Sequence, residues 1–128
     1  MRNTLASVRY IDLGTEAWGR SIEHFVYTEL RAYLDYTSDR RDLSFWRTRD
    51  NRKIDFIIGD DTAIEVKATS NPSERHIKNL AELEHEGRFR HRLLVCAVDK
   101  PRKIGQVEIV PLNHFLQQLW KGVYTSIT

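Results

Sequence analysis

Cysteine and proline are scarce in this chain of 128 residues, which has one cysteine (Cys96), three prolines and six glycines. A single cysteine excludes an internal disulfide and a zinc site built from several thiolates. No segment approaches the run of roughly 20 apolar residues that a membrane-spanning helix requires, and the first residues lack the apolar core of a signal peptide. These absences predict an intracellular, cytoplasmic protein with no membrane partner.

Nucleotide-binding and zinc-protease motifs are absent as well, since the chain contains no GxxxxGK[ST] loop, no GxGxxG run and no HExxH. We therefore expect no nucleotide hydrolysis by this chain alone. The length, with 41% hydrophobic and 30% charged residues, predicts one globular domain over residues 1–128. The net charge is only +2, but basic residues cluster in residues 40–53 and 88–103. Such clusters are typical either of solvated turns or of a surface that follows a phosphate backbone.

Apolar residues recur at helical spacing in some segments and form strand-like runs in others. The expected elements are a short strand over 8–13, a helix over 15–36, strands over 43–48, 54–58 and 63–68, a helix over 71–86 capped by Ser73, a strand over 91–98, a basic turn over 100–105, a strand over 106–110, and a helix from Pro111 to Trp120. The helix before the strand at 91–98 is typical of a crossover connection. The predicted fold class is α/β, with a mixed central sheet flanked by helices.

Charged residues interrupt two of these strands in the segment KIDFIIGDDTAIEVKA. Asp55 lies inside the first strand, and Glu65 and Lys67 lie two residues apart in the next, so that these two project from one face. We expect Asp55 to point away from Ile54 and Phe56. Pairing of the strands about a tight glycine-containing turn would bring Asp55 beside or near Glu65. The sequence therefore predicts two carboxylates and one ammonium group in close proximity.

Charges within β-branched strands are costly when they are buried without partners. One compensation is a divalent cation, because Mg²⁺ favours one or two carboxylates together with water and substrate phosphate. Such an ion polarises a phosphoryl oxygen and acidifies water, and Lys67 would then orient the water or stabilise charge in the transition state. The alternative is a cross-strand salt bridge of Lys67 with Asp55 or Glu65, worth about 0–1 kcal/mol where it is exposed.

Three pieces of the chain, GRSIEHFVYTEL, LSFWRTRDNRKIDFII and AIEVKATSNP, resemble in this order the DUF4143 domain. That domain is usually the C-terminal part of a bacterial and archaeal ATPase family. More broadly, IDFII and AIEVKA resemble the core motif of the PD-(D/E)xK nuclease superfamily, with Ile54 where the superfamily name has proline. The resemblance covers Gly19 to Leu83. It implies a restriction-endonuclease-like αβββαβ core, a metal-dependent phosphodiesterase site and an ATPase module as a partner.

The resemblance assigns Asp55 and Glu65 as metal ligands and Lys67 as the catalytic lysine. A glutamate of the first helix commonly completes such a site. Glu23, in the GRSIEHF piece, matches best, and Glu29, in phase with the apolar helix face, is the rival. The cofactor would be Mg²⁺ or Mn²⁺ and the substrate DNA, so the chain is expected to be an endonuclease-like hydrolase. The alternative is a catalytically silent module of the same fold that binds DNA or a partner ATPase.

Further residues have both a structural and a functional interpretation. Three basic residues are candidates for contacts with DNA phosphates: Arg47, Arg49 and Lys78. Protective charge at a strand edge explains the first two equally well, and a solvated helix face is favoured for the third. The aromatic residues are assigned to packing rather than to stacking on bases: Trp18, Phe45, Trp46 and Trp120. Cleavage of both DNA strands would favour a homodimer with two sites.

Overall fold

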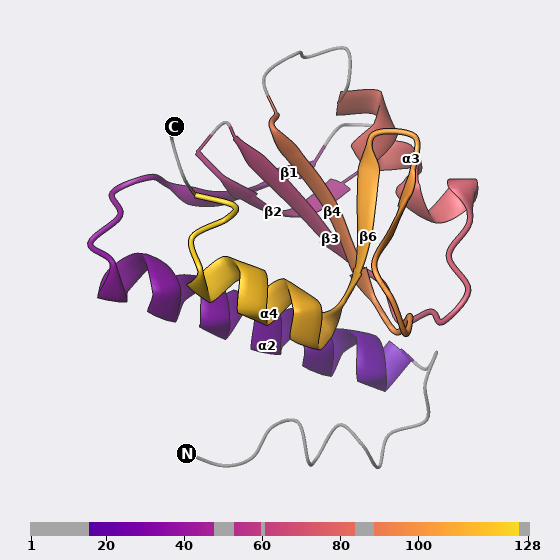
Figure 1. The fold of residues 1–128 in the computed structure, drawn as a ribbon, viewed down its shortest axis with the longest axis horizontal. Helices are drawn as coiled ribbons and strands as arrows, with labels where there is room; N and C mark the ends of the chain where they lie inside the picture. The colour runs from indigo at the N-terminus through magenta and orange to yellow at the C-terminus, as the bar shows by residue number, and fades with distance from the viewer. Residues whose placement is uncertain (1–15, 48–52, 60, 84–88, 126–128) are drawn as a thin grey trace.

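The computed structural model describes residues 16–47, 53–59, 61–83 and 89–125, and the strand expected over residues 8–13 lies outside them. The elements in chain order are α2 (Glu16–Tyr36), β1 (Leu43–Arg47), β2 (Lys53–Ile58), β3 (Thr62–Val66), α3 (Glu74–Glu82), β4 (His91–Cys96), β5 (Arg102–Ile104), β6 (Val107–Pro111) and α4 (Leu112–Trp120) (Figure 1). The first six follow the predicted order of one helix, three strands, a second helix and a fourth strand. No helix among the described segments combines the length and the apolar character needed to cross a membrane.

The strands form one sheet of six in the order β1-β2-β3-β4-β6-β5. The pairs β1–β2, β2–β3 and β5–β6 are antiparallel, whereas β3–β4 and β4–β6 are parallel. The parallel pair β3–β4 requires a crossover, and α3 supplies it. The α/β fold class with a mixed central sheet is therefore confirmed.

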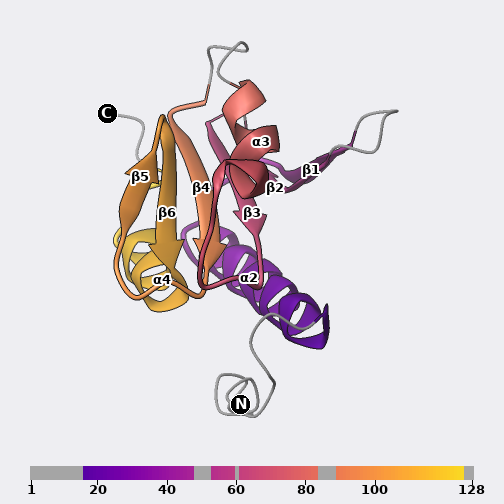
Figure 2. The ribbon, with the colours of Figure 1, turned by 90° about the vertical axis from the view of Figure 1, so that its right-hand side faces the viewer.

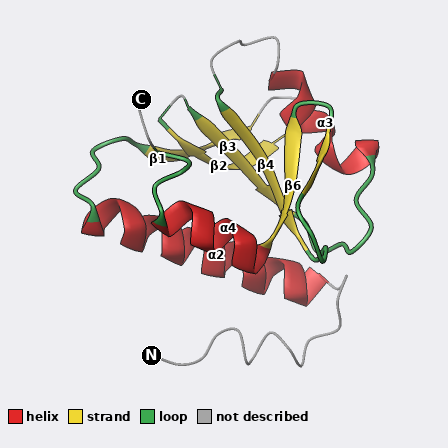
Figure 3. Cartoon of the chain, in the orientation of Figure 1, coloured by secondary structure: helices red, strands yellow, loops and turns green. Residues whose placement is uncertain are grey.

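Helices cover both faces of the sheet, with α2 and α4 on one face and α3 on the other (Figures 1 and 2). The same three layers are visible when helices and strands are coloured by type (Figure 3). Strand β4 supplies Leu93 and Val95 to the core under α2 and α4, and Leu94 and Cys96 to the core under α3. Its continuous apolar run thus marks a central strand buried on both faces, as predicted. Cys96 is a core residue.

The C-terminal third departs from the prediction in two places. The expected basic turn over 100–105 contains strand β5, which pairs with β6 through Gly105 at a φ of +59°. The sequence RKI has no apolar alternation because β5 is a short, mostly exposed edge strand, where basic residues discourage pairing with other chains. Pro111 closes β6 and serves as the N-cap of α4, so the helix begins one residue later than predicted. Helix α3 begins at Glu74 rather than at residue 71, and Ser73 is its N-cap, as predicted.

Candidate active site

The candidate site lies where β2 and β3 separate. Their last paired residues toward the site are Phe56 and Ile64. Beyond this point, side chains form hydrogen bonds with backbone groups that would otherwise pair the two strands. The Val66 amide donates to Asp55 Oδ2 at 2.9 Å, and Asn79 Nδ2 on α3 donates to the Lys53 carbonyl at 3.0 Å. The two strands are therefore held apart with their polar groups satisfied, and a charged side chain lies at the fork.

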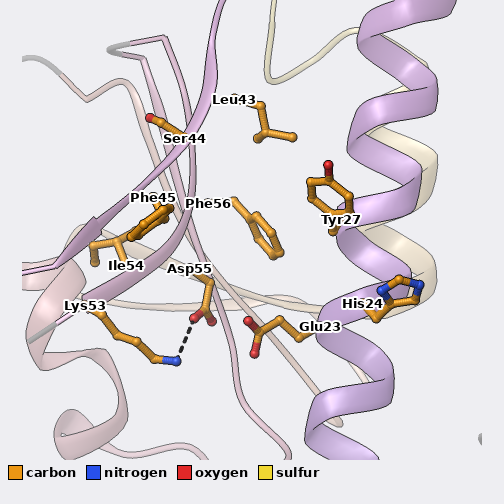
Figure 4. Close-up of a pocket in the computed structure, with 10 residues that line it drawn as sticks. All are labelled: Glu23, His24, Tyr27, Leu43, Ser44, Phe45, Lys53, Ile54, Asp55 and Phe56. Atoms are coloured by element: carbon orange, nitrogen blue, oxygen red, sulfur yellow. Dashed lines mark ion pairs between the residues drawn. The ribbon is translucent and has the colours of Figure 1, made fainter.

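A β-bulge directs the side chain of Asp55. Across from the single residue Phe45 of β1 lie two residues of β2, Asp55 and Phe56. Ile54 packs in the core under α3 and Phe56 in the core under α2. Asp55 lines the same groove as Phe56, on the side of α2 (Figure 4). Ile54 and Phe56 face opposite sides of the sheet, so the expectation that Asp55 points away from both is wrong, because an extra residue in one strand interrupts the alternation of side chains.

The structure brings the predicted acidic residues and two lysines together around Asp55. Glu65 and Asp55 are buried, with exposed fractions of 1% and 8%. Lys67 Nζ lies 4.0 Å from Glu65 Oε2, and Lys53 Nζ lies 3.4 Å from Asp55 Oδ1. Sequence analysis did not assign Lys53 to the site. Its position two residues before Asp55 in the same strand was the available signal, because residues two apart in a strand project from one face.

Positive charge at this site does not balance the carboxylates. Burial, together with the nearby charge of Asp55, raises the pKa of Glu65 to about 8, although Lys67 and Lys53 oppose the rise. Burial and Asp55 also raise the pKa of Glu23. An added cation at the fork would therefore stabilise the ionised forms of Glu65 and Glu23, which burial disfavours.

One carboxylate oxygen of Glu65 is available to accept a hydrogen bond or to bind a cation. Glu65 Oε1 is buried and has no hydrogen-bond partner, and such an atom is costly unless a ligand satisfies it. Within the part of the chain that the structure describes, no group of three or more His, Cys, Asp or Glu residues is arranged to hold a metal ion. The partnerless oxygen of Glu65, together with the neighbouring carboxylate of Asp55, is the kind of donor set that fits an ion taking one or two carboxylates and completing its shell with water and substrate oxygens, as Mg²⁺ does.

The two candidate glutamates of α2 lie in different surroundings. Glu23 is half-buried and faces Asp55 across the groove (Figure 4). Glu29 lies farther along the helix, where its Oε1 accepts a hydrogen bond from Trp120 Nε1 at 3.0 Å. The structure therefore brings Glu23, and not Glu29, to the fork. Glu29 was the alternative to Glu23 because it is in phase with the apolar face of α2. Its contact with Trp120 of α4 explains that position.

A groove of about 440 Å³ opens from the fork along β1 and α2. Phe45 and Tyr27 line it and are 70% and 44% exposed. The prediction assigned Phe45 to core or rim packing, and the core part of it is wrong, because the side chain extends from β1, an edge strand of the sheet that the described residues form. Trp46 packs partly against the core under α3, whereas 42% of Trp120 is exposed. The side chain of Trp18 lies outside the part of the chain that the structure describes.

Of the three predicted DNA-contacting residues, the structure describes the side chain of Lys78, which is not at the fork. Lys78 is exposed on α3 and lines a different groove, beside Ile104 and Gly105 of the β5–β6 hairpin. Arg49 and the side chain of Arg47 lie outside the described residues.

Comparison with known proteins gives a family assignment. The family model described as "Domain of unknown function (DUF4143)" matches residues 18–115. This range includes both separated strands, all but the first two residues of α2, and every predicted site residue. No curated protein and no solved structure matches the chain. The chain therefore belongs to the DUF4143 family.

Proposed function

We propose that this protein is a divalent-metal-dependent DNA phosphodiesterase with a PD-(D/E)xK type of site. The observation that carries the proposal is the buried pair Asp55 and Glu65 at the strand fork, with Glu65 Oε1 lacking a partner and Lys67 beside it. The order of elements from α2 to β4 also fits the αβββαβ core that the motif implies. Ile54 replaces the proline of the motif name and packs in the core, so this departure leaves the acidic residues unchanged.

Each residue has a role that follows from its position. Asp55 and Glu65 would hold Mg²⁺ or Mn²⁺, with Glu23 completing the site from α2. The ion would supply Lewis acidity toward a phosphodiester and make nearby water more acidic. Lys67 is in position to orient a water molecule or to stabilise charge on the phosphate. Lys53, with its Nζ 3.4 Å from Asp55 Oδ1, would offset part of the negative charge at the fork.

The two glutamates of α2 provide a matched test of this proposal. Glu23→Gln is expected to lower Mg²⁺-dependent cleavage of plasmid DNA at least about a hundredfold, because it removes a charge that faces Asp55. Glu29→Gln is expected to keep wild-type activity, since its amide oxygen can still accept the bond from Trp120. EDTA should stop cleavage by the wild type and by Glu29→Gln, the two proteins that are expected to be active. Equal activity of the two variants, or cleavage that continues in EDTA, would contradict the assignment.

A second candidate function is a silent module of the same fold that binds DNA or a partner ATPase. The observation that favours it is the lack, among the described residues, of a preformed group of three metal ligands. Such a module would show no metal-dependent cleavage in the wild type. The plasmid assay above therefore separates the two functions.

A further inference from the structure

The groove beside the acidic fork combines two kinds of surface. At one end lie Glu23, Asp55 and Lys53, and along its length lie the rings of Phe45 and Tyr27 (Figure 4). Phe45 and Tyr27 are substantially exposed, although both are large apolar side chains. Contiguous exposed apolar surface with polar groups at its rim is typical of ligand-binding grooves.

The positions of the rings follow from the same local structure that directs Asp55. Phe45 is the β1 residue opposite the β-bulge, so it lies across from Asp55 itself. Tyr27 lies four residues after Glu23 and therefore on the same face of α2. Tyr27 also stacks on Phe56, with ring centroids 6.2 Å apart and an angle of 26° between the planes. The groove is thus lined by the buried ring of Phe56 and by the exposed rings of Phe45 and Tyr27.

We infer that this groove binds a nucleobase from an unpaired stretch of DNA, next to the phosphate at the acidic fork. This inference rests on the proposed function and names its substrate class. A planar base matches the aromatic rings, and its phosphate matches Lys53 and the cation proposed for the acidic fork. The volume of about 440 Å³ falls within the range of ligand-binding clefts. A base within a duplex is covered on both faces by its neighbours, so a base must leave the stack to contact Phe45.

The inference is tested by binding measurements in EDTA, where metal-dependent cleavage cannot occur. Fluorescence anisotropy of the full chain would compare a short oligothymidylate, an abasic oligonucleotide of the same length, and the corresponding duplex. The abasic strand keeps the phosphates and lacks the bases, so the difference reports on base contacts alone. We expect the wild type to bind oligothymidylate roughly tenfold more tightly than the abasic strand, and more tightly than the duplex.

Aromatic variants locate the contact. Phe45→Ala and Tyr27→Ala are expected to lose the preference for the base-bearing strand, and Phe45→Trp to keep it. Tyr36→Ala is the control, because Tyr36 is an exposed aromatic on α2 that does not line the groove. Phe45 is so exposed that its replacement should not unfold the chain. A wild type without the preference, or one whose preference survives in Phe45→Ala, would overturn the inference.

Two further outcomes are distinguishable. If the base preference is present but the wild type never cleaves DNA, the proposed hydrolysis fails and the assignment of the groove stands. If Phe45→Ala dissociates a dimer and leaves oligonucleotide binding unchanged, the ring belongs to an interface between copies of the chain, and the inference is wrong. Sedimentation of the same variants gives this second result.

Discussion

Replacement of Asp55 by asparagine is expected to lower Mg²⁺-dependent DNA cleavage at least about a thousandfold while leaving the fold intact. Asp55 is the residue around which the site is built, since burial first and then the charge of Asp55 raise the pKa of both Glu23 and Glu65. The amide removes the negative charge that would bind a cation. It keeps an oxygen that can accept the hydrogen bond from the Val66 amide, so the separated strands retain this contact.

The choice of asparagine matters because alanine would leave the buried Val66 amide without a partner, at a cost of about 1–3 kcal/mol. A loss of activity in Asp55→Ala would then mix catalysis with folding. Asp35→Asn is the matched control, since Asp35 forms only an exposed ion pair with Arg31 on the surface of α2. Plasmid cleavage and thermal unfolding would be measured for both variants. Activity of Asp55→Asn equal to that of the control would show that Asp55 has no catalytic role.

Replacement of Glu65 by glutamine is expected to stabilise the protein at alkaline pH. In the folded chain the pKa of Glu65 is raised to about 8 from its ordinary value of 4.5, chiefly by burial and then by Asp55. Between these values the folded state holds a proton that the unfolded state has released. The free energy of unfolding of the wild type therefore falls as pH rises through this window. Glutamine does not titrate, so the variant escapes this loss.

The measurement is Tm as a function of pH. We expect the wild type and Glu65→Gln to differ little near about pH 5 and the variant to melt at least about 4 °C higher near about pH 8.5. Mg²⁺ should raise the Tm of the wild type at the higher pH, because a cation favours the ionised carboxylate, and should leave the variant unchanged. Glu29→Gln serves as the control and should follow the wild type. Parallel pH curves for wild type and Glu65→Gln would contradict the burial argument.

Much of this arrangement can be predicted from residue patterns. Burial of one face explains the period of the apolar residues in α2, and burial of both faces explains the unbroken apolar run of β4. The glycine turn between β2 and β3 is marked by its own local sequence. The hairpin register then places Asp55 near Glu65 without further information. These elements required no knowledge of long-range packing.

Other features depend on contacts between distant segments. The bulge that turns Asp55 toward α2 arises from the pairing of β1 with β2, and no residue in KIDFII marks it. Asn79 holds the fork from α3, 26 residues away from Lys53. The exposure of Phe45 follows from the position of β1 at the sheet edge, which depends on the order of all six strands. Such features follow from tertiary structure and are not encoded by local propensity.

Crystals soaked in MnCl₂ would show whether Asp55 and Glu65 hold a divalent cation. Manganese has a strong anomalous signal and prefers the oxygen ligands that Mg²⁺ prefers. We predict an anomalous peak at the strand fork, in contact with Asp55 and with Glu65 Oε1, in the wild type and not in Asp55→Asn. Wild-type crystals without a peak at the fork, or with the same peak in Asp55→Asn, would contradict it.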